Sequence, residues 1–436
     1  MTCEYNFTVE TYLTLSKACW DCPFNVTDCF RLQCVSGDGH RRPIVTINRE
    51  LPGPAIEVCE GDRVVVWVTN ELDDGATTSI HWHGMHQKGT PYMDGPAHIT
   101  QCPIQPMETF RYEFVATPAG THWYHSHSAM QLGDGAYGSF IVRQPQTADH
   151  NSPLYDLDLS DHVMHITDWM PVLSIDRYLN LMHDAYLGHE MSALINGRAR
   201  NYPVPNTFNT SGSPLSEAYT PMAEFHVQKD KRYLFRLICP AQKCAFRVFF
   251  DDHPVQIVST DGMPVSPVTV DSLIISPGER YDVIISADQP VDNYWIRAYG
   301  LRDCYNKGDV VAILKYDGAD DANQSADPGP YKNGTMYGPL LDARNRPIYS
   351  AMTFLNNDNS KFNNKDLYDV KSLPGYKYHL TPVMDNITFR LPPVPLLSQP
   401  EDVQEAWFCN KSTVNHSQCQ HDLCRCTHRL MVQHGQ

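Results

Sequence analysis

The sequence lacks three features that would each have suggested a class of function. No apolar run approaches the roughly 20 residues that a membrane helix needs, so we expect no membrane span. The 436 residues carry a formal net charge of −16, which argues against a nucleic-acid partner because such a partner selects a basic face. Residues 1–18 contain Glu4 and Glu10 but no apolar signal-peptide core. We therefore expect the written start to lie downstream of the biological one.

The cysteines lack the compact spacing of a metal cluster. There are 14, at positions 3, 19, 22, 29, 34, 59, 102, 239, 244, 304, 409, 419, 424 and 426. An even number scattered through a long chain favours disulfides in an oxidising compartment over free thiols. The last two cysteines and His428 could be read as a zinc site, but their spacing fits no common zinc finger.

Glycosylation sequons favour the same compartment. An asparagine stands two residues before Ser or Thr at positions 6, 25, 209, 323, 333, 386, 410 and 415. We therefore expect an extracellular, disulfide-bonded glycoprotein, although chance sequons remain an alternative.

Short β-rich segments between turn residues dominate the chain, which holds 32 Pro and 25 Gly. Examples are "DRVVVWVTN" (62–70), "THWYHSH" (121–127) and, after a polar break, "RYDVIIS" (280–286). This spacing predicts an all-β fold with two sandwiches in tandem. We expect a Cys-rich lead-in (1–40), sandwiches at 41–150 and 151–317, a linker or long loop (318–385) and a tail (386–436) with the strand-like piece "NITFRLP".

Two His-x-His pairs, "SIHWHG" (79–84) and "HWYHSH" (122–127), stand out. In a strand, residues i and i+2 point to the same face. His81 and His83 therefore share one face, as do His125 and His127, and four imidazoles converge if the two strands meet. Imidazole suits Cu, Zn, Fe and Ni. A structural zinc site and coincidental core histidines remain open at this point.

The same parity argument turns His122 away from the other two histidines of its strand, so we interpret it as a packing or surface residue. His86 and His98 lie in a turn-rich stretch and are interpreted as structural or supporting residues.

The stretches "HWHGMHQKGTPYMDG", "TQCPI" and "GTHWYHSHSAMQLGDGAYGSFIV" resemble the first domain of the multicopper oxidases, and most of all the laccases of insects. Upstream, "YLTLSKACWDCPFNVTDC" resembles the lead-in of that group. Downstream, "INGR" (195–198) and "SPGERYDVII" (276–285) resemble its second domain. The resemblance implies tandem cupredoxin-like Greek-key β-sandwiches, followed by an incomplete start of a third.

The resemblance also implies copper chemistry. A type 1 copper would take single electrons from a phenolic or diphenolic reductant, and a cluster of one type 2 and two type 3 coppers would reduce O2 to water. By position, His81 resembles the type 2 ligand, while His83, His125 and His127 resemble type 3 ligands. Asp94, in "YMDG", resembles an outer-sphere carboxylate that orients a ligand or assists proton delivery; a simple turn Asp before Gly95 is the alternative.

The sequence departs from the family pattern in one respect. The "HPxHxHG" and "HCHxxxH" motifs of the third domain, which supply the type 1 copper and the remaining cluster ligands, are absent from it. We therefore expect a C-terminally truncated laccase-type oxidase whose activity as a single chain is doubtful. A non-catalytic secreted copper-binding or partner-binding module is the alternative, and a ferroxidase is the variant within the class. The residues do not indicate an oligomeric state.

Overall fold

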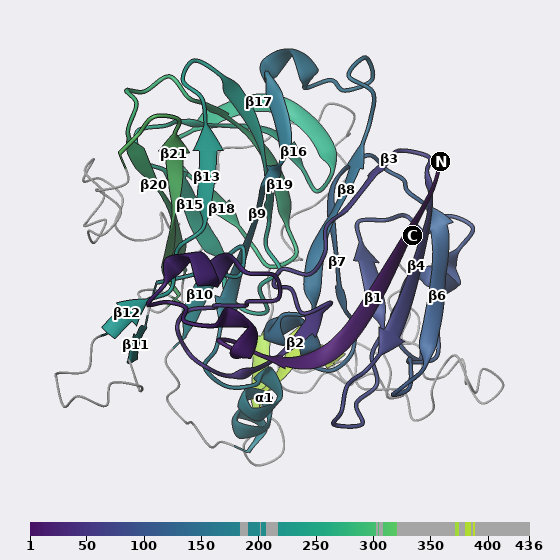
Figure 1. Ribbon diagram of the computed structural model, residues 1–436. Helices are drawn as coiled ribbons and strands as arrows, with labels where there is room; N and C mark the ends of the chain where they lie inside the picture. The colour runs from purple at the N-terminus through teal and green to yellow at the C-terminus, as the bar shows by residue number, and fades with distance from the viewer. Residues whose placement is uncertain are drawn as a thin grey trace, which may run out of the picture.

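The computed structural model describes residues 1–183, 191–200, 202–205, 217–301, 304 and 308–320, together with three short strands between residues 371 and 388. Strands dominate the fold, and most of them belong to two pairs of stacked sheets (Figure 1). The fold is therefore the expected all-β arrangement of two tandem sandwiches.

The first sandwich is built from eight strands. One sheet has the order β2-β1-β4-β6 and the other β3-β8-β7-β5. The bounds are β1 Thr2–Leu13, β2 Pro43–Ile47, β3 Ile56–Cys59, β4 Arg63–Asn70, β5 Ile80–His83, β6 Thr109–Val115, β7 Gly120–Ser126 and β8 Tyr137–Arg143. Short 3-10 helices lie at Lys17–Cys19, Val26–Phe30, Pro91–Met93, Gln131–Asp134 and Ser152–Leu154.

Alternating side chains build the core between these two sheets. On β4, Val64, Val66 and Val68 are completely buried, whereas Trp67 on the opposite face is exposed. Trp82 of β5 and Tyr124 of β7 enter the same core. A period of two therefore orients both histidine-bearing strands, because their apolar residues must face this core.

Residues 2–13 differ from the expectation of a lead-in that ends at residue 40. They form β1, which pairs with β2 on one side and β4 on the other. They form a strand because their side chains alternate between the two faces, which buries Phe7 and Val9 in the core. The cysteine-rich part of that lead-in follows β1 and contains the disulfides Cys19–Cys34 and Cys22–Cys29.

The second sandwich follows the polar break. Its sheets have the orders β10-β9-β14-β19-β16-β17 and β13-β21-β20-β15-β18. The bounds are β9 Leu157–Trp169, β10 Ser192–Ile195, β13 Glu224–Val227, β14 Arg232–Ile238, β15 Phe246–Phe250, β16 Val255–Thr260, β17 Met263–Val270, β18 Leu273–Ile275, β19 Arg280–Ser286, β20 Asn293–Gly300 and β21 Val310–Tyr316. A third disulfide, Cys244–Cys304, lies in this half.

The remaining elements are short. They are helix α1 (Ser174–Met182), the hairpin of β11 (Pro203–Pro205) and β12 (Glu217–Tyr219), and a sheet of β22 (Lys371–Pro374), β23 (Leu380–Met384) and β24 (Ile387–Thr388). Two of these last strands lie within the stretch expected to be a linker. Most of that stretch and most of the tail at 386–436 lie outside the described residues. No helix described here has the length and hydropathy that crossing a bilayer demands.

Strand β7 lies between the two sandwiches, with β8 beside it (Figure 1). Successive side chains of β7 point to opposite faces. Tyr124 enters the core of the first sandwich, whereas Trp123 packs with Val163 and Ile238 of the second sandwich. Every residue from Thr121 to Ser126 is consequently buried.

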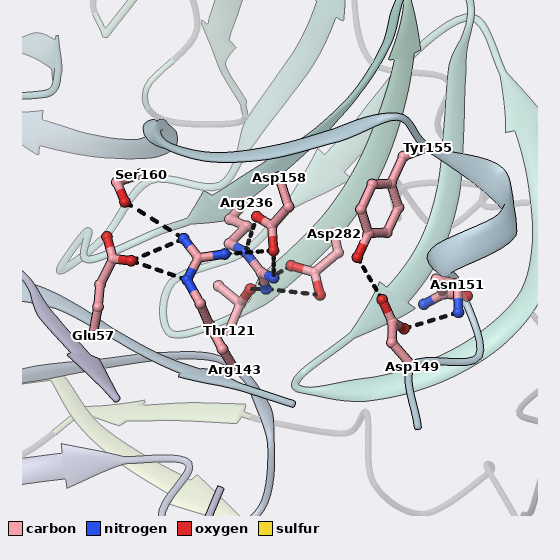
Figure 2. Close-up of polar contacts among 10 residues, drawn as sticks. All are labelled: Glu57, Thr121, Arg143, Asp149, Asn151, Tyr155, Asp158, Ser160, Arg236 and Asp282. Atoms are coloured by element: carbon pink, nitrogen blue, oxygen red, sulfur yellow. Dashed lines mark hydrogen bonds and ion pairs between the residues drawn. The ribbon is translucent and has the colours of Figure 1, made fainter. Parts of the chain in front are cut away.

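A buried charge network joins β7 and β8 to the second sandwich (Figure 2). Arg236 donates to Thr121 Oγ1 of β7 at 2.7 Å and to both carboxylate oxygens of Asp158 at 3.0 and 2.7 Å. Arg143 of β8 donates to the same carboxylate at 2.6 Å. Thr121 also donates to Asp282. The strand that carries two of the histidines is therefore held by the other sandwich.

We expect Arg236→Ala to lower the free energy of unfolding by roughly 3–5 kcal/mol, because it leaves the buried Asp282 carboxylate without the guanidinium 3.7 Å away and removes two hydrogen bonds from Asp158. Arg232, four residues earlier on β14, offers a matched control because its partner Asp156 is a surface residue. Urea denaturation of Arg232→Ala should give an unchanged curve. Equal losses in the two variants would contradict a structural role for the network.

Candidate metal centre

The four predicted histidines come together at the end of the pairing between β5 and β7. The strands are antiparallel, and His81 lies directly opposite His125. His127 follows the end of β7, where its backbone N–H donates to the carbonyl of Ser79 at 2.9 Å. The convergence that the alternation predicts is therefore present.

Three of the rings form a compact set. One ring nitrogen from each of His81, His83 and His125 lies within 4.8 Å of the others. The ring of His127 lies beside this group, with its centroid 5.7 Å from that of His81 and 6.0 Å from that of His125. His125 is buried and His127 is exposed, so the centre opens toward solvent on the His127 side.

Backbone carbonyls orient two of these rings. His81 donates from Nδ1 to the carbonyl oxygen of Asp94 at 2.8 Å, and His125 donates from Nδ1 to the carbonyl oxygen of Ser126 at 2.9 Å. Each bond places the ring proton on Nδ1 and leaves the lone pair of Nε2 free to bind a metal.

Burial keeps three of the rings in the neutral form that binds metals. Loss of solvent lowers the pKa of His125 to about 3, and burial together with the Arg280 guanidinium holds the pKa of His83 far below its usual range. The pKa of His127 is lowered by the same loss of solvent. These three imidazoles are therefore deprotonated at neutral pH, as a ligand set requires.

Asp94 lies beside His81, and its main contact with that ring comes from its backbone rather than from its carboxylate. Its carbonyl oxygen accepts the 2.8 Å bond from His81, whereas its carboxylate Oδ1 lies 3.5 Å from the same nitrogen. Gly95 makes this approach possible. It has a φ of +103°, and a Cβ there would lie 2.0 Å from the carbonyl oxygen of Ile80.

His122 takes no part in the cluster. Its Nε2 donates to the carbonyl oxygen of Pro118 at 3.0 Å, and its ring packs against Gly84 and Gly262. This agrees with the interpretation as a packing residue. His86 is exposed.

The sequence reasoning missed Trp123 and the contribution of the second sandwich. The Trp123 ring stacks on His83 and His125, at centroid distances of 4.9 and 4.3 Å. Parity could have found it, because Trp123 is two residues from His125 on the same strand. Gly278 of the second sandwich lies against His83, and only the fold reveals that contact.

The donor set fits a metal that prefers imidazole. It is all nitrogen, and the Nδ1–H groups of His81 and His125 donate to backbone carbonyls. Among the divalent first-row metals such a set favours copper. No cysteine and no carboxylate belongs to the three-residue group found in the described part of the chain.

Family comparisons agree with this chemistry. Models of the multicopper oxidase family match residues 31–147 and 160–319. Laccase-2 of Agaricus bisporus is 38% identical over 321 residues, which cover 71% of this chain and 58% of that protein. The laccase of Phlebia radiata is 35% identical, over 84% of this chain and 66% of its own length.

Comparison with solved structures also finds a laccase. The laccase of Botrytis aclada superposes with a TM-score of 0.69 and 29% identity, over 94% of this chain and 69% of that one. These relatives are fungal, so the comparisons support the resemblance to laccases but not the narrower resemblance to insect laccases. The chain spans about half to two thirds of the length of the curated relatives it matches.

The position of the Asp94 loop gives a direct test of what orients His81. Gly95→Ala should lower the Cu(II) affinity about 10–100-fold, because the new Cβ displaces the carbonyl that holds the ring. Asp94→Asn keeps that carbonyl and should change affinity far less. Calorimetric titration of both variants with Cu(II) measures the difference. A larger loss in Asp94→Asn would show that the carboxylate orients the ring instead.

Proposed function

The chain belongs to the multicopper oxidase family, and from this membership we propose that it is a laccase-type oxidase whose site histidines provide one part of a copper cluster. The observation that carries the proposal is the set of three imidazole nitrogens within 4.8 Å of one another, on one face of two paired strands.

We assign His81 as the type 2 ligand and His83, His125 and His127 as type 3 ligands. When bound, copper supplies the one-electron steps that couple oxidation of phenolic or diphenolic reductants to reduction of O2 to water. The protein's part is to present neutral nitrogens in a fixed arrangement. The hydrogen bonds of His81 and His125 to backbone carbonyls fix their Nδ1 protons and hence direct their Nε2 lone pairs.

The protein also controls the access of water. Trp123 covers the rings of His83 and His125 on the side of the second sandwich. Its own side chain is almost completely buried, at 2% exposure. O2 and protons therefore approach from the side of the exposed His127.

We propose that Asp94 assists proton delivery beside the centre. Its carboxylate Oδ1 lies 3.5 Å from His81 Nδ1, and the side chain remains 30% exposed. A carboxylate that touches both solvent and the site can take a proton from water and pass it toward reduced oxygen.

We propose that the protein is secreted. Its three described disulfides need an oxidising compartment to persist. The sequon residues Asn6 and Asn25 are both exposed, so a glycan can be attached to either. The other six sequons lie outside the described residues, apart from the backbone of two residues in β24.

Replacement of His125 tests the ligand set. His125→Ala should weaken Cu(II) binding by more than about tenfold, since it removes a buried ligand at the centre of the group. His86→Ala, which removes an exposed histidine five residues from His81, should leave binding unchanged. Electron paramagnetic resonance of the copper-loaded protein should also lose nitrogen couplings in the first variant only. Unchanged binding and spectra in His125→Ala would remove the basis of the proposal.

Copper loading of the 436-residue chain tests whether the site histidines bind copper without the type 1 site. The sequence holds neither family motif for the type 1 site, so we expect bound copper without a blue absorption band and without diphenol-dependent oxygen uptake. Observation of both would contradict the assignment. Sequencing of the 3′ end of the transcript separates an enzyme from a binding module, because a laccase-type product must encode both missing motifs.

A further inference from the structure

Two cysteines of the first sandwich, Cys3 and Cys59, lie beside the same carboxylate, that of Asp62, without a bond between them. Six described cysteines are paired in three disulfides, whereas these two carry free thiols. Cys3 lies on β1 in one sheet and Cys59 ends β3 in the other. A bond between them would join the two layers of the sandwich.

The strand directions bring the two residues into register. β1 runs parallel to β4, with Thr2 beside Arg63, and β4 follows β3 after a turn of three residues. β1 and β3 therefore run in opposite directions across the core. The hydroxyl of Tyr5 donates to the carbonyl oxygen of Glu57 at 3.2 Å, so the two strands are in contact at these positions.

Cys3 lies two residues before Tyr5 on β1, and Cys59 lies two residues after Glu57 on β3. Both steps lead toward the turn between β3 and β4. Because residues i and i+2 share a face, Cys3 points inward as Tyr5 and Phe7 do. The burial pattern agrees, since Cys3 is partly buried and its neighbours Thr2 and Glu4 are exposed.

One carboxylate oxygen contacts both cysteine residues. Asp62 Oδ2 accepts the backbone N–H of Cys59 at 2.8 Å and lies 3.8 Å from the Cys3 sulfur. The two residues therefore border the same carboxylate, and the pairing of two cysteines needs such proximity.

We propose that Cys3 and Cys59 form a disulfide that fastens β1 to the opposite sheet. The bond closes a long loop that contains β2 and the cysteine-rich segment. It anchors the strand that delivers Phe7, whose ring lies 4.9 Å from that of Tyr124 on β7. The disulfide would thereby hold in place the strand that packs against β7.

Thiol–disulfide exchange with a disulfide-bearing oxidant forms the bond. The thiolate of Cys59, which is exposed, attacks one sulfur of the oxidant and releases the other as a thiolate. The Cys3 sulfur then attacks Cys59 Sγ, which forms the new S–S bond and releases the second oxidant sulfur. The oxidant gains two electrons and the two thiol protons. Burial raises the pKa of the Cys3 thiol, so the exposed Cys59 begins the exchange.

Peptide mapping tests the pairing in the full chain secreted by a eukaryotic host. The protein is unfolded without reductant, its free thiols are alkylated, and it is digested with trypsin. Peptides 1–17 and 50–63 then carry one cysteine each, Cys3 and Cys59. We expect both to be unalkylated and joined as one species that separates on reduction. Alkylation of either cysteine, or a link to any other cysteine, would overturn the proposal.

Thermal unfolding provides a second measurement. Cys3→Ser, Cys59→Ser and the double variant should all lose the same amount of Tm, at least about 4 °C, because each removes the same bond. Additive losses in the double variant would instead indicate two unconnected side chains. Cys102→Ser, at another exposed cysteine, should retain the joined peptides and serves as the control. Since the mapping uses the unmodified chain, poor folding of a variant leaves the pairing test intact, and neither measurement depends on copper.

Discussion

The antiparallel pairing of β5 with β7 is the constraint on which the metal centre depends. It places His81 opposite His125, and a slip of one residue would turn two of the imidazoles into the apolar core. The register is held on the core side by the buried rings of Trp82 and Tyr124. The hydrogen bond from His127 to Ser79 extends it past the end of the strand. Hydrophobic packing on one face thus determines the geometry of metal ligands on the other.

The second sandwich completes the environment of these ligands. It covers the outer face of β7 through Trp123 and the buried charges around Arg236 and Thr121 (Figure 2). This contact removes water from His83 and His125, which is the main reason that their pKa values fall. Neutral imidazoles at neutral pH are therefore a consequence of the packing between the two sandwiches. A first sandwich alone would leave the same rings more hydrated and easier to protonate.

Much of the site was predictable because it depends on local periodicity. Alternation along each strand placed His81 with His83 and His125 with His127, and it excluded His122. The same rule would have identified Trp123. The same alternation is present in β1, which buries Phe7 and Val9 within the stretch expected to be a Cys-rich lead-in. The orienting role of the Asp94 carbonyl was not predictable, because a backbone atom leaves no signal in residue identity.

The sequence by itself determined which side chains share a face, since the side-chain direction along a strand reverses with every residue whatever the strand packs against. It thereby determined the two histidine pairs, the all-β class and the resemblance to multicopper oxidases. Only the tertiary structure decided that the pairs meet, that a loop at Gly95 brings a carbonyl to His81, and that Cys3 and Cys59 border the same Asp62 carboxylate. These contacts join residues far apart in the chain, and their distances follow from the packing of whole sheets.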